Sequence, residues 1–245
     1  MVNFKGREKM KTIGLIGGMT WESSLEYYRV INESIKEKLG GSHSAKCVLY
    51  SVDFNEIEFL HRQKNWPKAT EIMIDAGQRL KKAGADFLII CTNLMHKMAE
   101  DVRTSTNLPL LHIVDATSAK IKDCGMTKVG LLGSIFTMEE DFYKKRLLEK
   151  HGIEVVIPEK EDRRYVGEAV YHEFSIGRFT DKTSGKFKEI ILKLQRQGAE
   201  GIILGCTEIP LYIKQKDYDI MLYDTTTLHA KAAAAYALGE FTIAE

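Results

Sequence analysis

The sequence predicts an α/β fold of two pseudo-symmetric parallel-sheet domains, each a flavodoxin-like, three-layer α/β/α unit. Three observations predict it. Short apolar runs alternate with longer amphipathic stretches, several runs stop at glycine or a small polar residue, and the same landmarks occur twice in the same order. Short apolar runs that alternate with helical patterns are typical of parallel sheets covered by helices. We infer that the chain arose by an internal duplication.

The first half begins with an apolar strand over residues 12–18 that ends in two glycines. A helix is expected to follow and to run to about Leu39, with Thr20 or Ser23 as its N-cap. Beyond this helix we predict a strand at 47–54, a loop that contains His61, and a helix at 68–82. A strand that ends at 91–93, a helix from 94 and a strand at 109–113 are predicted to follow.

The second half repeats this order of elements. We predict strands at 127–134, 154–158, 201–204 and 219–223, and helices at 138–150, 162–174, 181–197 and 230–238. An Asp-x-Thr sequence is expected to cap a helix in each half, at Asp115 and at Asp224. We therefore predict a first domain of residues 1–113 plus 223–245, a second of residues 114–222, and an active site in the crevice between them.

The most informative repeat lies where two apolar strands end. Residues 83–93 align without gaps with residues 197–207, because a Gly-Ala pair occurs at the same place in both. In this alignment Thr92 corresponds to Cys206, whereas Cys91 corresponds to a glycine. A shift of one residue would pair the two cysteines but would break the Gly-Ala match. Ligands of open α/β sheets bind at the carboxyl ends of the strands, so these residues are candidates for catalysis.

Composition narrows the class of function. The 245 residues carry a net charge of +1, which gives no sign of a nucleic-acid or membrane surface, and no apolar run approaches the about 20 residues of a membrane span. The four cysteines lack metal-ligand spacing, and the glycine-rich turn lacks the dinucleotide and phosphate-loop fingerprints. We expect a cytoplasmic protein with reduced thiols that binds a small molecule and needs no metal, pyridoxal phosphate or other cofactor.

Two similar halves place two similar groups on opposite sides of a ligand. This arrangement suits the transfer of a proton from one face of a carbon atom to the other, since one group removes a proton and the other returns one. A thiol suits the role if helix N-termini or cations lower its pKa from about 8.5 towards neutrality. Donors near the substrate carboxylate would stabilise the carbanion, and Thr20, Asn93 and Thr207 are candidates.

Three separated motifs resemble those of the aspartate/glutamate racemase family. They are residues 13–23, 91–97 and 205–209, and they agree with the family in order and spacing. The resemblance covers nearly the whole chain from Met10. It implies a pyridoxal-phosphate-independent amino-acid racemase with two pseudo-symmetric domains, which forms a homodimer. In that family two cysteines, each at a strand end, act as the bases, and Cys206 matches the second.

The first motif departs from the family pattern. Where the family has Cys-Asn-Thr, this chain has Thr92, Asn93 and Leu94, with Cys91 one residue earlier. The chain therefore resembles a subgroup with threonine at the first acid/base position, similar to racemases that are specific for L-aspartate/glutamate or broad in specificity. A threonine hydroxyl is a much weaker acid than a thiol, so it donates a proton more readily than it acts as a base. Cys91 remains the alternative.

The resemblance and the predicted turns together indicate the site. The predicted catalytic pair is Thr92 and Cys206. The predicted substrate-binding residues are Met19, Thr20, His61, Asn93, Leu94, Thr207 and Glu208. We expect His96 to bond to backbone rather than to activate a thiol, and Glu208 either to orient Cys206 or only to stabilise the start of a helix.

The predicted function is a cofactor-independent racemase of an amino acid, aspartate or glutamate, by two-base 1,1-proton transfer. One alternative is a decarboxylase or a cis–trans isomerase of a dicarboxylic acid in the same superfamily, which a single thiol would suit. Another is a non-catalytic amino-acid-binding protein. Exchange of the substrate α-hydrogen, release of carbon dioxide, and binding without exchange distinguish the three.

Overall fold

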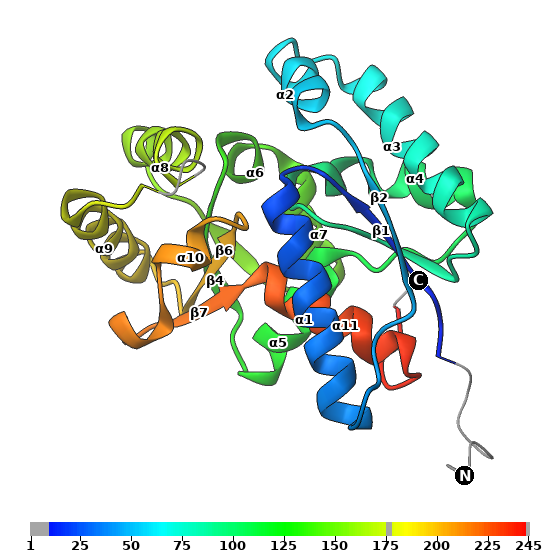
Figure 1. Ribbon diagram of the computed structural model, residues 1–245. Coiled ribbons are helices and arrows are strands. Elements are labelled where there is room, and N and C mark those ends of the chain that lie inside the picture. Colours follow the sequence, from blue (N-terminus) through cyan, green and yellow to red (C-terminus); the bar gives the residue numbers. More distant parts are fainter. Residues whose placement is uncertain (1–9, 175–177, 244–245) are drawn as a thin grey trace. The chain divides into compact units, whose positions relative to one another are not determined.

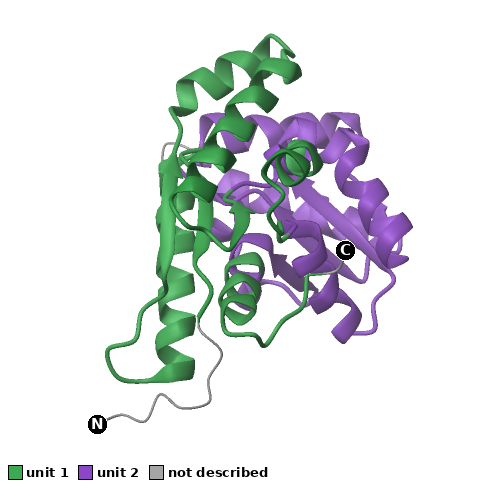
Figure 2. Cartoon of the chain, turned by 90° about the vertical axis from the view of Figure 1, so that its right-hand side faces the viewer, with its two compact units in different colours: residues 1–91, 98–111, 229–245 green, residues 92–97, 112–228 purple. Residues whose placement is uncertain are grey.

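The computed structural model describes residues 10–174 and 178–243 and contains two parallel β-sheets with helices packed on them (Figure 1). The chain forms two compact units, coloured separately in Figure 2. Unit 1 comprises Met1–Cys91, Met98–Leu111 and His229–Glu245, and unit 2 comprises Thr92–Lys97 and His112–Leu228. The predicted α/β class with two parallel sheets is confirmed. The domain division at residues 113 and 222 stays a proposal.

Unit 1 contains a three-stranded parallel sheet in the order β2-β1-β3. Its strands are β1 (Ile13–Gly17), β2 (Cys47–Ser51) and β3 (Phe87–Ile90), and its helices are α1 (Trp21–Leu39), α2 (Phe54–Arg62), α3 (Trp66–Lys82) and α4 (Ala99–Thr106). Every residue of β1 and β3 is buried. Burial on both faces explains why these strands appear in the sequence as continuous apolar runs rather than as an alternating pattern.

The turn after β1 depends on Gly18. Its φ angle is +93°, and a Cβ atom at this position would collide with the backbone of Val52, so only glycine fits. The Gly18 N–H donates to Ser24 Oγ at 2.8 Å. Thr20 is the N-cap of α1, where its side chain accepts from the Ser23 N–H, and the predicted cap is confirmed.

Unit 2 contains a four-stranded parallel sheet in the order β5-β4-β6-β7. Its strands are β4 (Lys128–Gly133), β5 (Glu154–Val156), β6 (Gly201–Gly205) and β7 (Met221–Asp224). The helices that follow or connect them are η1 (Leu94–Met98), α5 (Ile113–Asp123), α6 (Ile135–Glu139), α7 (Asp141–His151), α8 (Lys160–His172), α9 (Asp181–Arg196), α10 (Ile209–Tyr212), η3 (Gln215–Asp217) and α11 (Thr225–Ala237). Helix α11 begins in unit 2 and ends in unit 1.

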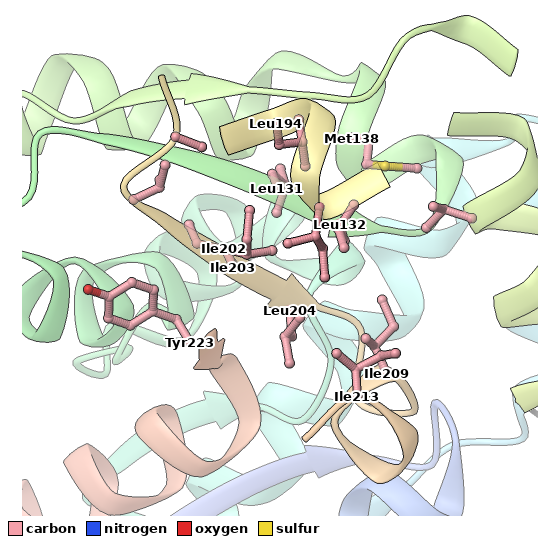
Figure 3. Close-up of a cluster of buried hydrophobic side chains, with 14 of the residues drawn as sticks. Leu131, Leu132, Met138, Leu194, Ile202, Ile203, Leu204, Ile209, Ile213 and Tyr223 are labelled. Carbon is pink, nitrogen blue, oxygen red and sulfur yellow. The ribbon is translucent and has the colours of Figure 1, made fainter. Parts of the chain in front are cut away.

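The core of unit 2 is built around β6, as the close-up in Figure 3 shows. Leu204, near the end of the strand, is 2% exposed. Ile209 and Ile213, which come after the strand, turn back into the same buried cluster. The short segment between Leu204 and Ile209 is therefore anchored in the core on both sides, and this segment contains Cys206.

Three local predictions are wrong. Residues 109–113 form no strand beyond a single parallel bridge between Leu88 and Leu110, and α5 already begins at Ile113. His61 lies in the last turn of α2 rather than in a loop, because the Asp53 side chain accepts from the Asn55 N–H and caps a helix there. The single helix expected over residues 138–150 is instead two helices, α6, which Ser134 caps and which ends at Glu139, and α7, which begins at Asp141.

The two Asp-x-Thr sequences also differ. Asp224 accepts from backbone N–H groups at the start of α11, as a cap does, so that prediction is confirmed. Asp115 does not cap α5, because His112 takes that position. The Asp115 carboxylate instead accepts from Arg146 at 2.7 and 2.6 Å and contacts His151 at 2.8 Å. Burial alone would raise the Asp115 pKa, but these partners hold the pKa well below its usual range.

Candidate active site

The pairing of strands identifies equivalent positions in the two sheets. Ile90 of β3 lies opposite Ile16 of β1. Leu204 of β6 lies opposite Leu132 of β4. Ile16 and Leu132 each precede the glycine that ends the first strand of their sheet. Ile90 and Leu204 are therefore equivalent, and so are the residues two places after them.

Those residues are Thr92 and Cys206, so the register inferred from the repeat is confirmed. Cys91 instead occupies the position of Gly205 and is fully buried. Burial raises the pKa of the Cys91 thiol. Thr92, the next residue, is partly exposed, as is Cys206. The geometry thus favours Thr92 over Cys91 as the counterpart of Cys206.

Cys206 forms a compact cluster with the two residues after it. Its Sγ donates to Glu208 Oε2 at 2.8 Å, and Thr207 Oγ1 donates to the same oxygen at 2.9 Å. Burial raises the pKa of the Cys206 thiol well above its ordinary value, and the charge and hydrogen bond of Glu208 raise that pKa further. The backbone N–H groups of Thr207 and Glu208 act in the opposite direction.

The net shift of Cys206 is opposite to the one that the sequence suggested. We expected helix N-termini or cations to lower the thiol pKa. The helix after the turn, α10, has only four residues, and the nearest charged partner of the sulfur is a carboxylate. The thiol therefore holds its proton at neutral pH and has an acceptor for that proton 2.8 Å away.

The turn at Thr92 is fixed by His96. His96 Nδ1 lies 2.7 Å from the Thr92 carbonyl oxygen, and His96 Nε2 accepts from the Ile113 N–H at 3.2 Å. Because a carbonyl oxygen can only accept, Nδ1 carries the proton and the ring is neutral. The prediction that His96 bonds to backbone is confirmed. Leu94, the first residue of η1, lies two residues before His96 in the sequence and is also buried.

Asn93 connects this turn to the end of β6 through a residue that sequence reasoning missed. Asn93 Nδ2 donates to Thr225 Oγ1 at 3.0 Å, and Thr225 Oγ1 donates to the Leu204 carbonyl oxygen at 2.9 Å. Thr225 is fully buried at the start of α11. The repeated Asp-x-Thr pattern marked this region only as a helix cap. In the structure one hydroxyl joins the segment that carries Thr92 to the strand that leads to Cys206.

The remaining predicted site residues belong to unit 1. Met19 is 6% exposed in the turn after β1, and Thr20 caps α1. His61 is buried, and its ring centroid lies 5.2 Å from that of Trp66. The substrate-binding roles of Met19, Thr20 and His61 stay predictions.

The described ranges, 10–174 and 178–243, contain no group of three or more His, Cys, Asp or Glu side chains placed to hold a metal ion. Over the same residues, none of the helices has both the length and the apolar composition that crossing a membrane requires. The four cysteines are Cys47, Cys91, Cys124 and Cys206, and all four are free thiols.

Comparison with known proteins agrees with this arrangement. A candidate Asp/Glu racemase from Yersinia pestis has a solved structure that is 50% identical to this chain, with a TM-score of 0.89 over 94% of this chain and 100% of the other. An aspartate racemase homologue from Pyrococcus horikoshii is 36% identical, with a TM-score of 0.81 over 93% and 99%.

Sequence comparison leads to the same group of proteins. A broad specificity amino-acid racemase of Bacillus subtilis is 22% identical over 226 residues, which is 91% of this chain and 96% of the relative. Residues 16–233 match the Asp/Glu/hydantoin racemase family as a whole. The resemblance inferred from the three motifs is therefore confirmed. The chain belongs to the Asp/Glu/hydantoin racemase family.

Proposed function

We propose that this chain is a cofactor-independent amino-acid racemase whose substrate is aspartate or glutamate, with Thr92 and Cys206 as its two proton-transfer groups. Membership of the family supports racemase activity. The observation that carries the proposal is the hydrogen bond from the Cys206 thiol to Glu208, at the strand position equivalent to Thr92. A thiol with a carboxylate partner is equipped both to release a proton and to accept one.

Cys206 becomes a base by passing its proton to Glu208. The S–H bond breaks, the carboxylate becomes a carboxylic acid, and a thiolate is left beside the backbone N–H groups of Thr207 and Glu208, which favour the charged form. The thiolate then removes the α-proton of a bound amino acid. The Thr92 hydroxyl donates its proton to the opposite face of the carbanion, which inverts the configuration. The Thr92 alkoxide then takes a proton from water, and Glu208 releases to water the proton that it received from Cys206, so both groups return to their starting state.

The reverse direction is harder, because Thr92 would have to act as the base. An unperturbed hydroxyl is almost entirely protonated at neutral pH, far more so than a thiol. Among the residues that the structure describes, no carboxylate is hydrogen-bonded to the Thr92 hydroxyl in the way that Glu208 is bonded to Cys206. We therefore propose that the two enantiomers lose their α-proton at different rates.

Two further properties are part of the proposal. The resemblance to the family supports a homodimer, which light scattering would refute by detecting only the mass of one chain. The free thiols of Cys91 and Cys206 support a cytoplasmic location, where they would stay reduced. Met19, Thr20 and His61 complete the proposed set of substrate-binding residues.

The experiment that tests the function is proton NMR of L- and D-aspartate and L- and D-glutamate incubated with the purified protein in deuterium oxide. We expect loss of the α-hydrogen signal and formation of the opposite enantiomer, without pyridoxal phosphate or added metal. The Cys206→Ala variant, purified in the same way, controls for a contaminating racemase. Release of carbon dioxide from a dicarboxylic acid would support a decarboxylase instead. Binding without exchange would support an amino-acid-binding protein.

A further inference from the structure

The Thr225 hydroxyl determines which way the Asn93 amide faces. A hydroxyl has one proton, and Thr225 donates it to the Leu204 carbonyl oxygen at 2.9 Å, because a carbonyl oxygen can only accept. Thr225 Oγ1 must therefore accept from its other neighbour, which is Asn93 at 3.0 Å. Only the Nδ2 atom of an amide can donate. The contact to Leu204 thus fixes the Asn93 amide with Nδ2 towards Thr225.

This orientation leaves the other amide atom without a partner. Asn93 Oδ1 is buried and accepts no hydrogen bond in the structure, and the Asn93 side chain as a whole is 3% exposed. Buried polar atoms almost always have partners, so an unpartnered acceptor next to a proposed catalytic residue indicates a missing donor. In an α-amino acid the group that can donate is the α-ammonium, since ionised carboxylates only accept.

We propose that Thr225 is a positioning residue that presents Asn93 Oδ1 to the substrate α-ammonium and ties this acceptor to the end of β6, two residues before Cys206. This inference rests on the proposed function and adds to it a determinant of substrate class. If the Thr225 hydroxyl were lost, the amide could rotate and present Nδ2, a donor, to the positively charged group. Ligands with an α-ammonium would then bind less well, whereas dicarboxylates without nitrogen would not be affected.

The test compares Thr225→Val with two controls. Thr225→Ser keeps the hydroxyl and should preserve both hydrogen bonds. Thr117→Val is a matched change elsewhere in unit 2. Thr117 is also fully buried, and its hydroxyl also donates to a backbone carbonyl oxygen, that of Ile113 at 2.8 Å. The two valine variants thus lose the same kind of buried hydroxyl, but only Thr225 accepts from the Asn93 amide.

Titration calorimetry gives the dissociation constants of aspartate and of succinate, a dicarboxylate of the same chain length without an ammonium. We expect Thr225→Val to weaken aspartate binding relative to succinate about tenfold, the change that follows loss of a hydrogen bond to a charged group. Thr225→Ser should keep the ratio of the two constants within about twofold. Thr117→Val should change both constants equally or not at all. If Thr225→Val does not fold, Asn93→Ala is expected to give the same loss of aspartate over succinate.

The outcomes separate this inference from the proposed function. Suppose that the unmodified protein exchanges the α-hydrogen of aspartate, but Thr225→Val leaves the ratio of the aspartate and succinate dissociation constants unchanged. The role of Thr225 is then wrong and the proposed function stands. If Thr225→Val does not fold, Asn93→Ala takes its place in this comparison. If the protein binds aspartate without exchange and Thr225→Val still changes the ratio, the function is wrong and the positioning role stands. If the unmodified protein binds neither ligand, both are overturned.

Discussion

The turn at Thr92 and the turn at Cys206 occupy the same strand position but differ in chemistry. Each comes two residues after equivalent positions in β3 and β6. Cys206 has the Glu208 carboxylate as a hydrogen-bond partner. The first turn has Leu94 where the second has Glu208 and so lacks an acid at that place. The backbone pairing is thus equivalent in the two sheets, whereas the side chains that we propose to exchange protons have different partners.

The two turns are also held in place differently. Hydrophobic burial anchors the second, because Ile209 and Ile213 pack into the core of unit 2 just after it (Figure 3). Polar contacts anchor the first, through His96 to the Thr92 carbonyl oxygen and through Asn93 to Thr225. Strand register alone therefore does not define a catalytic role, since the partners of each side chain decide whether it can release or accept a proton.

The largest effect is expected from Cys206→Ala, which removes the only one of the two proposed groups that has a proton acceptor. Exchange of the α-hydrogen of the L enantiomer, which the resemblance to the threonine subgroup suggests faces Cys206, should fall about 10²- to 10⁴-fold. NMR in deuterium oxide measures it. Exchange that persists within a few-fold of the unmodified rate would show that another group removes the proton.

An intermediate effect is expected from Glu208→Gln, which keeps the size of the side chain but removes its charge. Burial raises the Cys206 pKa first, and the Glu208 charge and hydrogen bond raise that pKa further, so the variant should lower the pKa of the thiol. A thiolate then forms at lower pH. The rate of alkylation by iodoacetamide, followed against pH, should have its midpoint shifted to lower pH in the variant. An unchanged midpoint, or one at higher pH, would show that Glu208 does not control the thiol.

The smallest effect is expected from Cys91→Ala. Cys91 is fully buried and its pKa is raised by burial, so its thiol is not placed to exchange protons with a substrate. Exchange rates for both enantiomers should stay within about twofold of the unmodified protein, because the mutation changes only packing. A large loss of exchange from one enantiomer alone would contradict this prediction, if the variant unfolds at the same temperature as the unmodified protein. Cys91 would then replace Thr92 as the second catalytic residue.

The sequence was sufficient for the α/β class and for the register of Thr92 against Cys206, because both depend on local patterns. Apolar runs mark buried parallel strands, and the repeated Gly-Ala pair fixed the alignment. The fourth strand of the first half was predicted in error at residues 109–113. Pro109 lacks an N–H, and the segment makes only one bridge before α5 begins.

The direction of the Cys206 pKa shift and the role of Thr225 could not be predicted, because both depend on groups brought together by folding. A glutamate two residues after a cysteine does not reveal from sequence whether its carboxylate contacts the sulfur. Likewise, Asn93 and Thr225 are separated by 132 residues in the chain but are hydrogen-bonded in the structure. Local patterns locate a turn, whereas side-chain partners across a fold set its proton chemistry.

The most direct test of the asymmetry between the two turns compares deuterium incorporation with inversion for each enantiomer of the substrate. The enantiomers have equal free energies, so kcat/KM for net inversion must be the same in both directions. A difference between the two proton-transfer groups therefore appears in deuterium exchange that regenerates the starting enantiomer. If Cys206 is the stronger base of the two proposed groups and Thr92 the weaker, L substrate should gain α-deuterium faster than it inverts. D substrate should gain α-deuterium no faster than the D substrate inverts. Equal incorporation into both enantiomers at early times would contradict the unequal roles of Thr92 and Cys206.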